Sequence, residues 1–302
     1  MYVHAGETTA VEVTCFGIAS VFTPPEKRGQ GFAKHMMRLL HWILAPHSSL
    51  PPFPKAFGEP PAELNRGKFS VLYSDVGPSF YLQCGPSEKG LDGWETRDEI
   101  STVWEVETAH QWMEKVNLTV SEDQWDWLDM SGAQKAWEDD KGHMNQNLVA
   151  WAKSTGHASC MILPGNGVAA YQCRRTISFA QVRTQYQRLN KWGVNIKISD
   201  ALDGTDTSHF VTWSFDLEPK HTTLIITRLR TDRATFPSLL YKIVKAAKML
   251  EVQRVEIWNL PVQLKGVATE LSGQTLKRQV NLPGIRVYGD ESANVDWIFN
   301  EK

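Results

Sequence analysis

The chain has 302 residues, of which 42% are hydrophobic and 22% are charged, with a formal net charge of -2. This length and composition suit a globular protein with enough apolar residues for two domains of ordinary size. Because neither sign of charge dominates, there is no global electrostatic reason to expect binding to nucleic acid or to an anionic membrane. No apolar run approaches the ~20 residues that a membrane-spanning helix needs.

The N-terminus and the cysteines predict a cytoplasmic location. The first ten residues lack the charged segment and the apolar core of a secretory signal. The four cysteines are scattered without a Cys-x-x-Cys pair, which is typical of reduced thiols inside a cell. The nine histidines show no metal-ligand spacing, so we expect no metal. The oligomeric state is left open.

Residues 17–40 read as an apolar strand, a proline pair, a basic and glycine-rich turn, and the start of an amphipathic helix. In the turn from Arg28 to Gly31, several backbone N–H groups would lack acceptors and point toward the positive end of the helix dipole. Such a turn binds phosphate, and its two glycines would let a pyrophosphate approach the backbone. The alternative is a tight strand-to-helix turn that binds nothing.

The spacing Arg28-x-x-Gly31-x-Ala33, with Pro25 three residues before the arginine, resembles the acyl-CoA pyrophosphate loop of the GCN5-related N-acetyltransferases, the GNAT superfamily. A Walker loop would end in Gly-Lys-Ser/Thr and a dinucleotide fingerprint would carry three glycines, and neither pattern is present. The resemblance implies acetyl-CoA as co-substrate. The residues that it implies for binding are Phe22, Thr23, Arg28, Gly29, Gln30, Gly31, Phe32, Ala33 and Ser74. The backbone N–H groups near Phe22 and Thr23 would hold the oxyanion.

A second motif spans residues 70–85, with a β-rich run, a break around Gly77 and a short helix that starts at Pro78. In the GNAT family this strand separates from its neighbour to admit the pantetheine arm, and the helix carries a tyrosine aimed at the thioester sulfur. Tyr81 stands at that place, so the resemblance implies that it is the general acid that protonates the leaving thiolate. A buried helix aromatic is the alternative. Ser74 stands where many members carry an asparagine that bonds the pantetheine.

Two segments around the first motif concern the acceptor side. A complete GNAT domain has three strands and two helices before the strand that leads into the glycine turn, whereas only about ten residues precede it here. We therefore expect the chain to be N-terminally incomplete. Six prolines between Pro46 and Pro61 predict an irregular loop, which is either a variable insertion or a lid over the acceptor site.

The sequence predicts three consecutive regions. Residues 1–106 would form the acetyl-CoA-binding GNAT domain, closed by short strands between Gly90 and Val106. Residues 107–157 would form a helical, Trp-rich connector whose tryptophans pack in a core or between domains. Residues 158–302 would form a second domain.

In this second domain VAAYQC, VNIKIS, HFVTWSF and TTLIITRL are strand-like, with a hairpin turn at 165–167. A helix over 239–250 and the strand VEIWNL then repeat the strand, helix, strand order of the first domain. The turn before that helix has no glycine, so we predict a degenerate GNAT-like domain that lacks the pyrophosphate loop. The cluster of three arginines near the end of TTLIITRL predicts a solvated strand edge or an anion site; these are Arg228, Arg230 and Arg233.

Together with WSF, LIITRL and EIWNLP in the second half, these motifs resemble the fungal lysine N-acetyltransferases of lysine catabolism. The expected fold is α/β (α+β), with a GNAT-type mixed sheet flanked by helices. The resemblance implies an enzyme that moves acetyl from acetyl-CoA to the side-chain amine of free lysine by direct attack. Two alternatives are the same chemistry on another small-molecule or protein amine, and a truncated chain that binds acyl-CoA or partner proteins without turnover.

Overall fold

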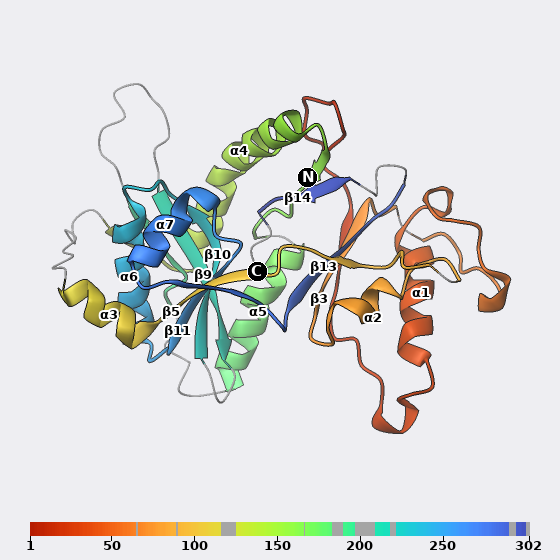
Figure 1. The fold of residues 1–302 in the computed structure, drawn as a ribbon, viewed down its shortest axis with the longest axis horizontal. Coiled ribbons are helices and arrows are strands. Elements are labelled where there is room, and N and C mark those ends of the chain that lie inside the picture. The colour runs from red at the N-terminus through yellow and green to blue at the C-terminus, as the bar shows by residue number, and fades with distance from the viewer. Residues whose placement is uncertain are drawn as a thin grey trace. The chain divides into compact units, whose positions relative to one another are not determined.

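The structure is a computed structural model that describes residues 1–64, 66–88, 90–115, 125–165, 167–182, 190–196, 209–217, 222–289 and 294–299. It is a mixed α/β protein, which confirms the predicted fold class, and it divides into two compact units (Figure 1). The first unit is built from residues 1–99, 143–162 and the stretch that begins at 278, and the second from residues 100–142 and 163–277.

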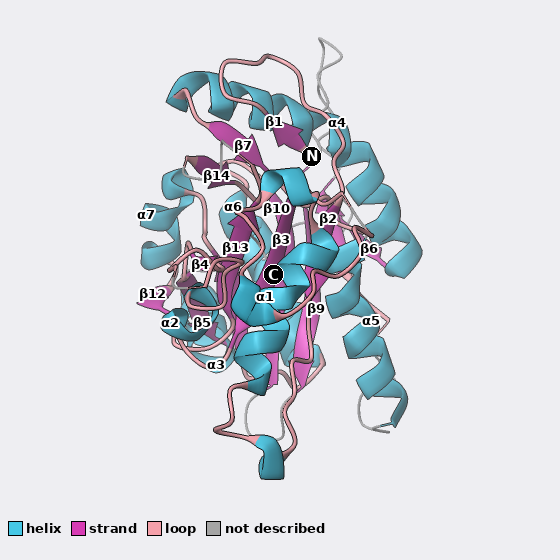
Figure 2. Cartoon of the chain, turned by 90° about the vertical axis from the view of Figure 1, so that its right-hand side faces the viewer, coloured by secondary structure: helices cyan, strands magenta, loops and turns pink. Residues whose placement is uncertain are grey.

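The central sheet of the first unit has the strand order β2-β3-β13-β4. β2 runs parallel to β3, whereas β13 runs antiparallel to both β3 and β4. The helices α1 and α2 lie beside this sheet (Figures 1 and 2). The elements are β2 (Cys15–Ile18), α1 (Phe32–Leu44), β3 (Phe69–Ser74), α2 (Pro78–Leu82), β4 (Glu95–Thr96) and β13 (Leu282–Val287).

A second, three-stranded sheet of the first unit has the order β1-β7-β14. It joins the two ends of the described chain, since β1 pairs with β7 antiparallel and β14 pairs with β7 in parallel. The 26-residue helix α4 precedes β7, and its residues from His143 onward belong to this unit. The elements are β1 (Tyr2–Val3), α4 (Met130–Thr155), β7 (Ala158–Cys160) and β14 (Val295–Trp297).

The second unit contains a sheet with the order β12-β5-β11-β10-β9-β8-β6. Eight of the nine residues of β9 and six of the nine residues of β10 are buried, which is the pattern of central strands covered on both faces. The parallel pair β10 and β11 is joined through α6. The strands are β5 (Ile100–Glu105), β6 (Trp125–Leu128), β8 (Gly193–Ile196), β9 (His209–Leu217), β10 (Thr222–Arg230), β11 (Arg254–Trp258) and β12 (Gln274–Lys277), and the helices are α3 (Val106–Lys115), α5 (Gly167–Val182), α6 (Phe236–Met249) and α7 (Val262–Glu270).

Both predicted strand, turn, helix segments of the first unit are confirmed. α1 begins at Phe32 and α2 at Pro78, as the sequence predicts. β2 is shorter than the apolar run that suggested it, because its pairing with β3 stops at Ile18. In its described residues, the proline-rich loop after α1 contains two 3-10 turns, at His47–Ser49 and Lys55–Phe57, and is otherwise irregular as expected.

The strand at Ile100–Glu105 does not close the first domain as predicted. Of the strands in that region, β4 joins the sheet of the first unit, but β5 pairs with β11 and β12 in the second unit. The strand between β3 and β4 is instead β13, which comes from near the end of the chain. The compact units therefore interleave along the sequence and do not coincide with the consecutive regions 1–106, 107–157 and 158–302.

Two predictions in the second half are wrong. VAAYQC lies in α5, and the reason is visible in burial: Ala170, Cys173 and Thr176 are the buried positions, spaced three apart on one helix face. Since α5 begins at Gly167, a hairpin turn at 165–167 is excluded, although residue 166 itself lies outside the described residues.

The prediction of a solvated strand edge is wrong for Arg228 and Arg230. Arg228 is 3% exposed, and its Nη2 lies 2.7 Å from Oδ2 of Asp140, a fully buried residue of α4. Arg230 Nη1 lies 3.4 Å from the other oxygen of the same carboxylate. The two arginines therefore anchor α4 to β10 through a buried ion pair.

The tryptophans of the predicted connector pack mainly in a core, as expected. Trp125 and Trp137 are buried in the core of the second unit, and Trp112 and Trp127 pack against it. Trp151 differs, because it is 48% exposed and donates a hydrogen bond to Asp296. The described residues of this region contain α3, β6 and α4, so this part is mainly helical.

Candidate functional site

The glycine turn before α1 has the backbone geometry of an anion site. Gly29 and Gly31 have φ of +75° and +82°, a conformation that glycine adopts without the cost imposed by a Cβ. Gly31 is the N-cap of α1 and no side chain caps the helix, whose first backbone bond runs from His35 N–H to the Gly31 carbonyl over 2.9 Å. In the described part of the chain, the N–H groups of the three preceding helical residues bond to no carbonyl. They are free to donate to an anion.

The polar side chains of the loop fold back onto it. Arg28 Nε donates to the Thr23 carbonyl over 3.0 Å, and its guanidinium carbon lies 5.9 Å from the centre of the Phe22 ring. Gln30 donates from Nε2 to the Glu26 carbonyl over 3.2 Å. These contacts stiffen the segment 22–30 while the backbone at both glycines stays exposed.

The strands next to this loop part at their carboxyl ends. The pairing of β2 with β3 stops at Ile18 and Leu72, although β3 continues to Ser74. Just beyond, Ser20 has a φ of +58°, a strained value for a residue other than glycine. Two parallel strands that separate beside this glycine turn leave backbone groups open to an extended ligand.

Tyr81 lies on α2, close to these strand ends. Its ring is half-buried and packs edge-on against Phe80 and Trp94, with centroids 5.0 Å and 6.4 Å away. Ile18 and Val21, which flank the point where β2 ends, pack against the same apolar cluster as Tyr81. The fold thus brings together the two segments that the sequence analysis singled out, around one small core.

The electrostatic surroundings keep the Tyr81 phenol protonated. Burial raises its pKa above the ordinary value of 10.0, and the nearby Cys84 thiol and Asp75 carboxylate raise it further. A phenol with a raised pKa holds its proton through the neutral range, which is required of a group that donates one.

The backbone of α2 is held by a close approach that needs glycine. The Tyr81 carbonyl accepts hydrogen bonds from the N–H groups of Cys84 and Trp94, both over 3.1 Å. A Cβ at Gly93 would lie 2.0 Å from that carbonyl oxygen, so no other residue fits there without displacing α2.

Ser74 is buried and occupied by the turn that precedes α2. Its hydroxyl donates to the Gly77 carbonyl over 2.9 Å and accepts from the Val76 N–H over 3.2 Å. In this conformation the side chain shapes the turn, and its role in cofactor binding stays a prediction.

Sequence reasoning missed a buried polar chain beneath α2. His41 Nε2 lies 3.0 Å from the Cys84 carbonyl, which can only accept, so Nε2 carries the ring proton and Nδ1 accepts from the Tyr288 hydroxyl over 3.1 Å. Tyr288 in turn accepts from Ser70 over 2.8 Å, and Ser70 accepts from the Trp94 indole over 2.9 Å. The chain joins α1, β3 and the end of α2.

His41 is neutral in this arrangement. Burial, and then the positive charge of nearby Arg286, lower its pKa to about 3. Its ring stacks on Trp94 at 4.1 Å between centroids, so it also supports the wall against which Tyr81 packs. In the sequence, the only indication of this hydrogen-bonded chain is a histidine on the apolar face of a predicted helix. Its partner Tyr288 lies 247 residues away, so their contact could not be predicted.

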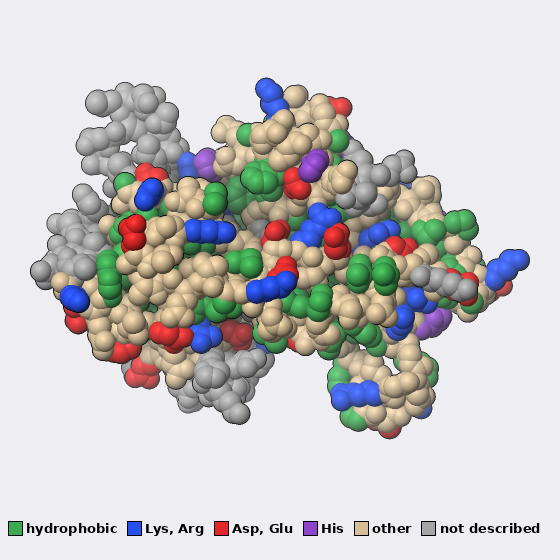
Figure 3. Space-filling view, in the orientation of Figure 1, with side chains coloured by type: hydrophobic (Ala, Val, Ile, Leu, Met, Phe, Trp, Pro, Cys, Tyr) green, Lys and Arg blue, Asp and Glu red, His purple; other side chains and the backbone are tan. Residues whose placement is uncertain are grey.

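The rest of the described chain adds three observations. On the face shown in Figure 3, basic and acidic side chains are interspersed, in keeping with a net charge near zero. Among the described residues there is no group of three His, Cys, Asp or Glu side chains that could hold a metal ion. No described helix is both long and apolar enough to cross a membrane.

Comparison with known proteins finds one family. Residues 109–302, more than half of the chain, match the family model described as the LYC1 GNAT-like C-terminal domain. The glycine turn and Tyr81 precede the matched residues. No curated protein matches the chain.

One similar solved structure is a GCN5-related N-acetyltransferase from Anabaena variabilis, with a TM-score of 0.44 and 15% sequence identity. The alignment covers 95% of this chain and 57% of that one, so the chain spans little more than half the length of that protein.

Proposed function

The chain belongs to the LYC1 GNAT-like C-terminal domain family, and from that membership we propose that it is an N-acetyltransferase that uses acetyl-CoA. The acceptor in this proposal is a primary amine, with the side-chain amine of free lysine preferred. The observation that carries the proposal is the geometry of the first unit. There an uncapped glycine turn and the parting ends of β2 and β3 adjoin the apolar cluster that holds Tyr81.

In the proposed complex the glycine turn binds the pyrophosphate of acetyl-CoA. The free N–H groups at the start of α1 donate to the phosphate oxygens, and Arg28 adds a permanent positive charge. The residues assigned to this contact are Arg28, Gly29, Gln30, Gly31, Phe32 and Ala33. Phe22 and Thr23, which lie beyond the end of β2, contribute backbone N–H groups toward the thioester carbonyl.

The proposed reaction is a direct transfer. The amine nitrogen forms a bond to the thioester carbon, the carbon–sulfur bond breaks, and the sulfur leaves as a thiolate. Tyr81 donates its hydroxyl proton to that thiolate, a step to which general acid catalysis contributes about 10²–10⁴-fold. The nitrogen loses a proton as the amide forms, and a proton taken up from solvent restores the Tyr81 phenol. The raised pKa of Tyr81 keeps the proton in place until the thiolate forms.

The acceptor must also lose a proton. A lysine amine with a pKa near 10.4 is about 3 units too protonated at pH 7, and freeing its lone pair costs about 4 kcal/mol. A carboxylate or a water chain near the acceptor has to take this proton.

A cytoplasmic location is part of the proposal, because all four cysteines are free thiols, as is usual in a reducing compartment.

Calorimetric titration of acetyl-CoA into the 302-residue chain, followed by an assay of thiol release with free lysine, tests the proposal. We expect saturable binding and lysine-dependent release of CoA, with Nε-acetyl-lysine identified by mass spectrometry. Release that depends on another amine would keep the reaction class and replace the substrate. Binding without transfer to any amine would make the chain a non-catalytic acyl-CoA-binding protein. A folded sample that does not bind acetyl-CoA would refute the proposal.

A further inference from the structure

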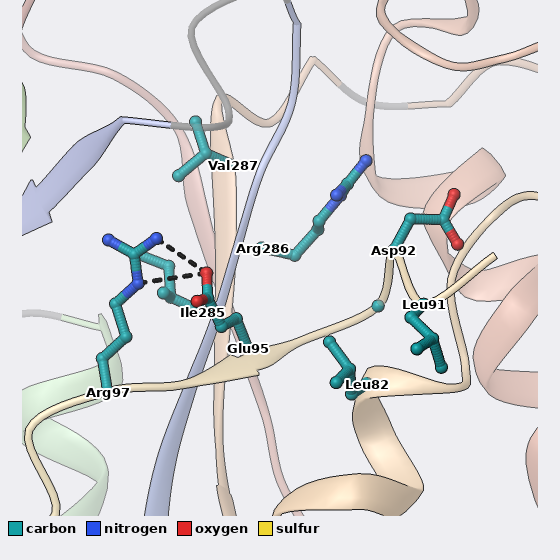
Figure 4. A pocket seen from close by; sticks show the side chains of 9 residues that line it. Leu82, Leu91, Asp92, Glu95, Arg97, Ile285, Arg286 and Val287 are labelled. Atoms are coloured by element: carbon teal, nitrogen blue, oxygen red, sulfur yellow. Dashed lines mark hydrogen bonds and ion pairs between the residues drawn. The ribbon is translucent and has the colours of Figure 1, made fainter.

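The first unit contains a cavity that the proposed transfer does not use. Its volume is about 300 Å³, at the lower end of the range for small-molecule sites. It opens because β4 pairs with β13 at only two positions, ending at Ile285 and Glu95, while β13 continues to Val287. The lining comes from the end of α2, the loop after it, β4 and β13 (Figure 4).

Four charged side chains line the cavity, and their charges sum to zero. Glu95 and Arg97 already satisfy each other, since Arg97 Nη2 lies 2.7 Å from the Glu95 carboxylate. Asp92 and Arg286 lie apart from that pair in Figure 4. Among the residues that the structure describes, neither Asp92 nor Arg286 has an ion-pair partner, and no ion pair joins the two.

Asp92 and Arg286 each contribute a buried atom that has no hydrogen-bond partner among the described residues. These atoms are Asp92 Oδ1 and Arg286 Nε. Burying a charged group without a partner is costly, so such atoms usually mark the place of a water or a ligand. The chain also makes room for the carboxylate, because a Cβ at Gly85 would lie 2.0 Å from Asp92 Oδ1.

The apolar part of the lining narrows the class of ligand. Leu82, Leu91, Ile285 and Val287 supply it. A phosphate or a nucleotide would bring an excess of negative charge to a lining whose net charge is zero, and a simple amine would leave Arg286 without a partner. A small molecule with one ammonium group, one carboxylate and an apolar remainder matches both charges and the apolar wall.

We propose that this cavity is a binding site for a free apolar α-amino acid, whose ammonium group contacts Asp92 and whose carboxylate contacts Arg286. The site is separate from the glycine turn, so the proposal goes beyond the acetyl transfer and does not depend on it. It rests on two oppositely charged side chains that line one cavity and form no ion pair with each other among the described residues.

Leucine is the probe. It is compared with isoamylamine, which lacks the carboxylate, and with 4-methylpentanoate, which lacks the ammonium group. Binding to the full chain is measured by calorimetry and by the shift in unfolding temperature, up to about 10 mM, ten times a Kd of 1 mM. We expect leucine to bind and to raise the unfolding temperature, and each analogue to bind about 10- to 100-fold more weakly, the loss of one hydrogen bond to a charged group.

Two variants locate the site, and a third is the matched control. Asp92→Asn and Arg286→Gln should each weaken leucine binding about 10-fold or more. Arg254→Gln removes an exposed arginine paired with Glu105 in the other unit and should change nothing. If a variant does not fold, the binding of leucine and its two analogues to the unmodified chain tests the proposal. Absence of leucine binding, equal binding of either analogue, or leucine binding that survives in both folded variants would overturn the proposal.

Discussion

The two units contain the same local topology with different chemistry at the start of the helix. In the first unit the parallel strands β2 and β3 are connected through α1, and in the second β10 and β11 are connected through α6. The start of α1 has two glycines at positive φ and no cap from a side chain. An anion can therefore approach its N–H groups.

The start of α6 is already occupied by an anion of the chain itself. Asp232 Oδ1 accepts the Thr235 N–H over 2.7 Å, and the Asp232 carbonyl accepts the Phe236 N–H over 3.1 Å. Burial alone would raise the pKa of Asp232, but the hydrogen bonds from Thr235 and the charge of His209 outweigh it and lower the pKa. A permanently charged carboxylate at this helix end repels a phosphate.

We infer two reasons why the start of α6 would not bind a pyrophosphate. The absence of glycine, which the sequence shows, denies a ligand access to the backbone. The Asp232 carboxylate, whose hydrogen bond to the Thr235 N–H is visible only in the structure, places a negative charge beside the start of α6. The predictions below test each side of this contrast.

Gly31→Glu should have the largest effect. The new side chain would project into the open space beside Gly31 and place a carboxylate at the proposed pyrophosphate site, so we expect acetyl-CoA affinity to fall about 100-fold or more, ~3 kcal/mol. Calorimetric titration measures this. Gly156→Glu is the matched control, because Gly156 also has a positive φ and open space around it, at the end of α4. A similar loss of affinity in both variants would assign the effect to backbone strain and remove the loop from the site.

Tyr81→Phe should spare acetyl-CoA binding and lower kcat by about 10²-fold or more, the contribution of a general acid. If Tyr81 is the general acid, its protonated phenol is the active form. Because burial raises the pKa of Tyr81 above 10.0, the alkaline fall in kcat of the unmodified chain should begin only above pH 10. That alkaline fall should be absent in the variant. Loss of binding equal to the loss of turnover would make Tyr81 a packing residue.

His41→Gln tests a difference between the helices themselves. α1 buries His41, whereas α6 buries Lys242, whose ammonium lies 4.9 Å from the centre of the Trp125 ring. The unfolded chain binds a proton at His41 below pH 6.5 and the folded chain only near pH 3, so stability due to this residue falls as pH drops through that window.

The free energy of unfolding should therefore decrease by about 2 kcal/mol between pH 6.5 and pH 5 through His41 alone. Urea unfolding of the unmodified chain and of His41→Gln at the two pH values measures it. The variant should lose less stability on acidification, while its stability at pH 7 reports the packing change separately. Parallel pH dependence in both proteins would mean that His41 is not kept neutral by the fold.

Local features of the first unit could be predicted from sequence because neighbouring residues determine them. The glycines before Phe32 and the proline at Pro78 specify where α1 and α2 begin, and the structure agrees at both positions. The placement of Tyr81 near the loop also follows, since α2 succeeds the strand that pairs with β2.

Long-range pairing could not be predicted in this way. β13 pairs with β3 more than 200 positions away, and β5 leaves the first unit for β11, although no local signal distinguishes these strands from the predicted ones. The strand prediction for VAAYQC was wrong for a different reason. Its short apolar run fits a strand or one face of a helix equally well. The cavity at Asp92 arises from the same long-range pairing and was invisible for that reason.

Asp232→Ala should have the smallest effect and completes the contrast. Removing the carboxylate deletes its hydrogen bond to the Thr235 N–H, and loss of one such bond costs about 1 kcal/mol of stability. It should create no acetyl-CoA binding in a chain whose own loop is disabled by Gly31→Glu, because α6 still lacks the glycines that expose its backbone. Asp232→Asn keeps an acceptor for Thr235 and should cost only a few tenths of a kcal/mol. If calorimetry found acetyl-CoA binding restored in the double variant Gly31→Glu, Asp232→Ala, the carboxylate alone would separate the two helices and glycine would be dispensable.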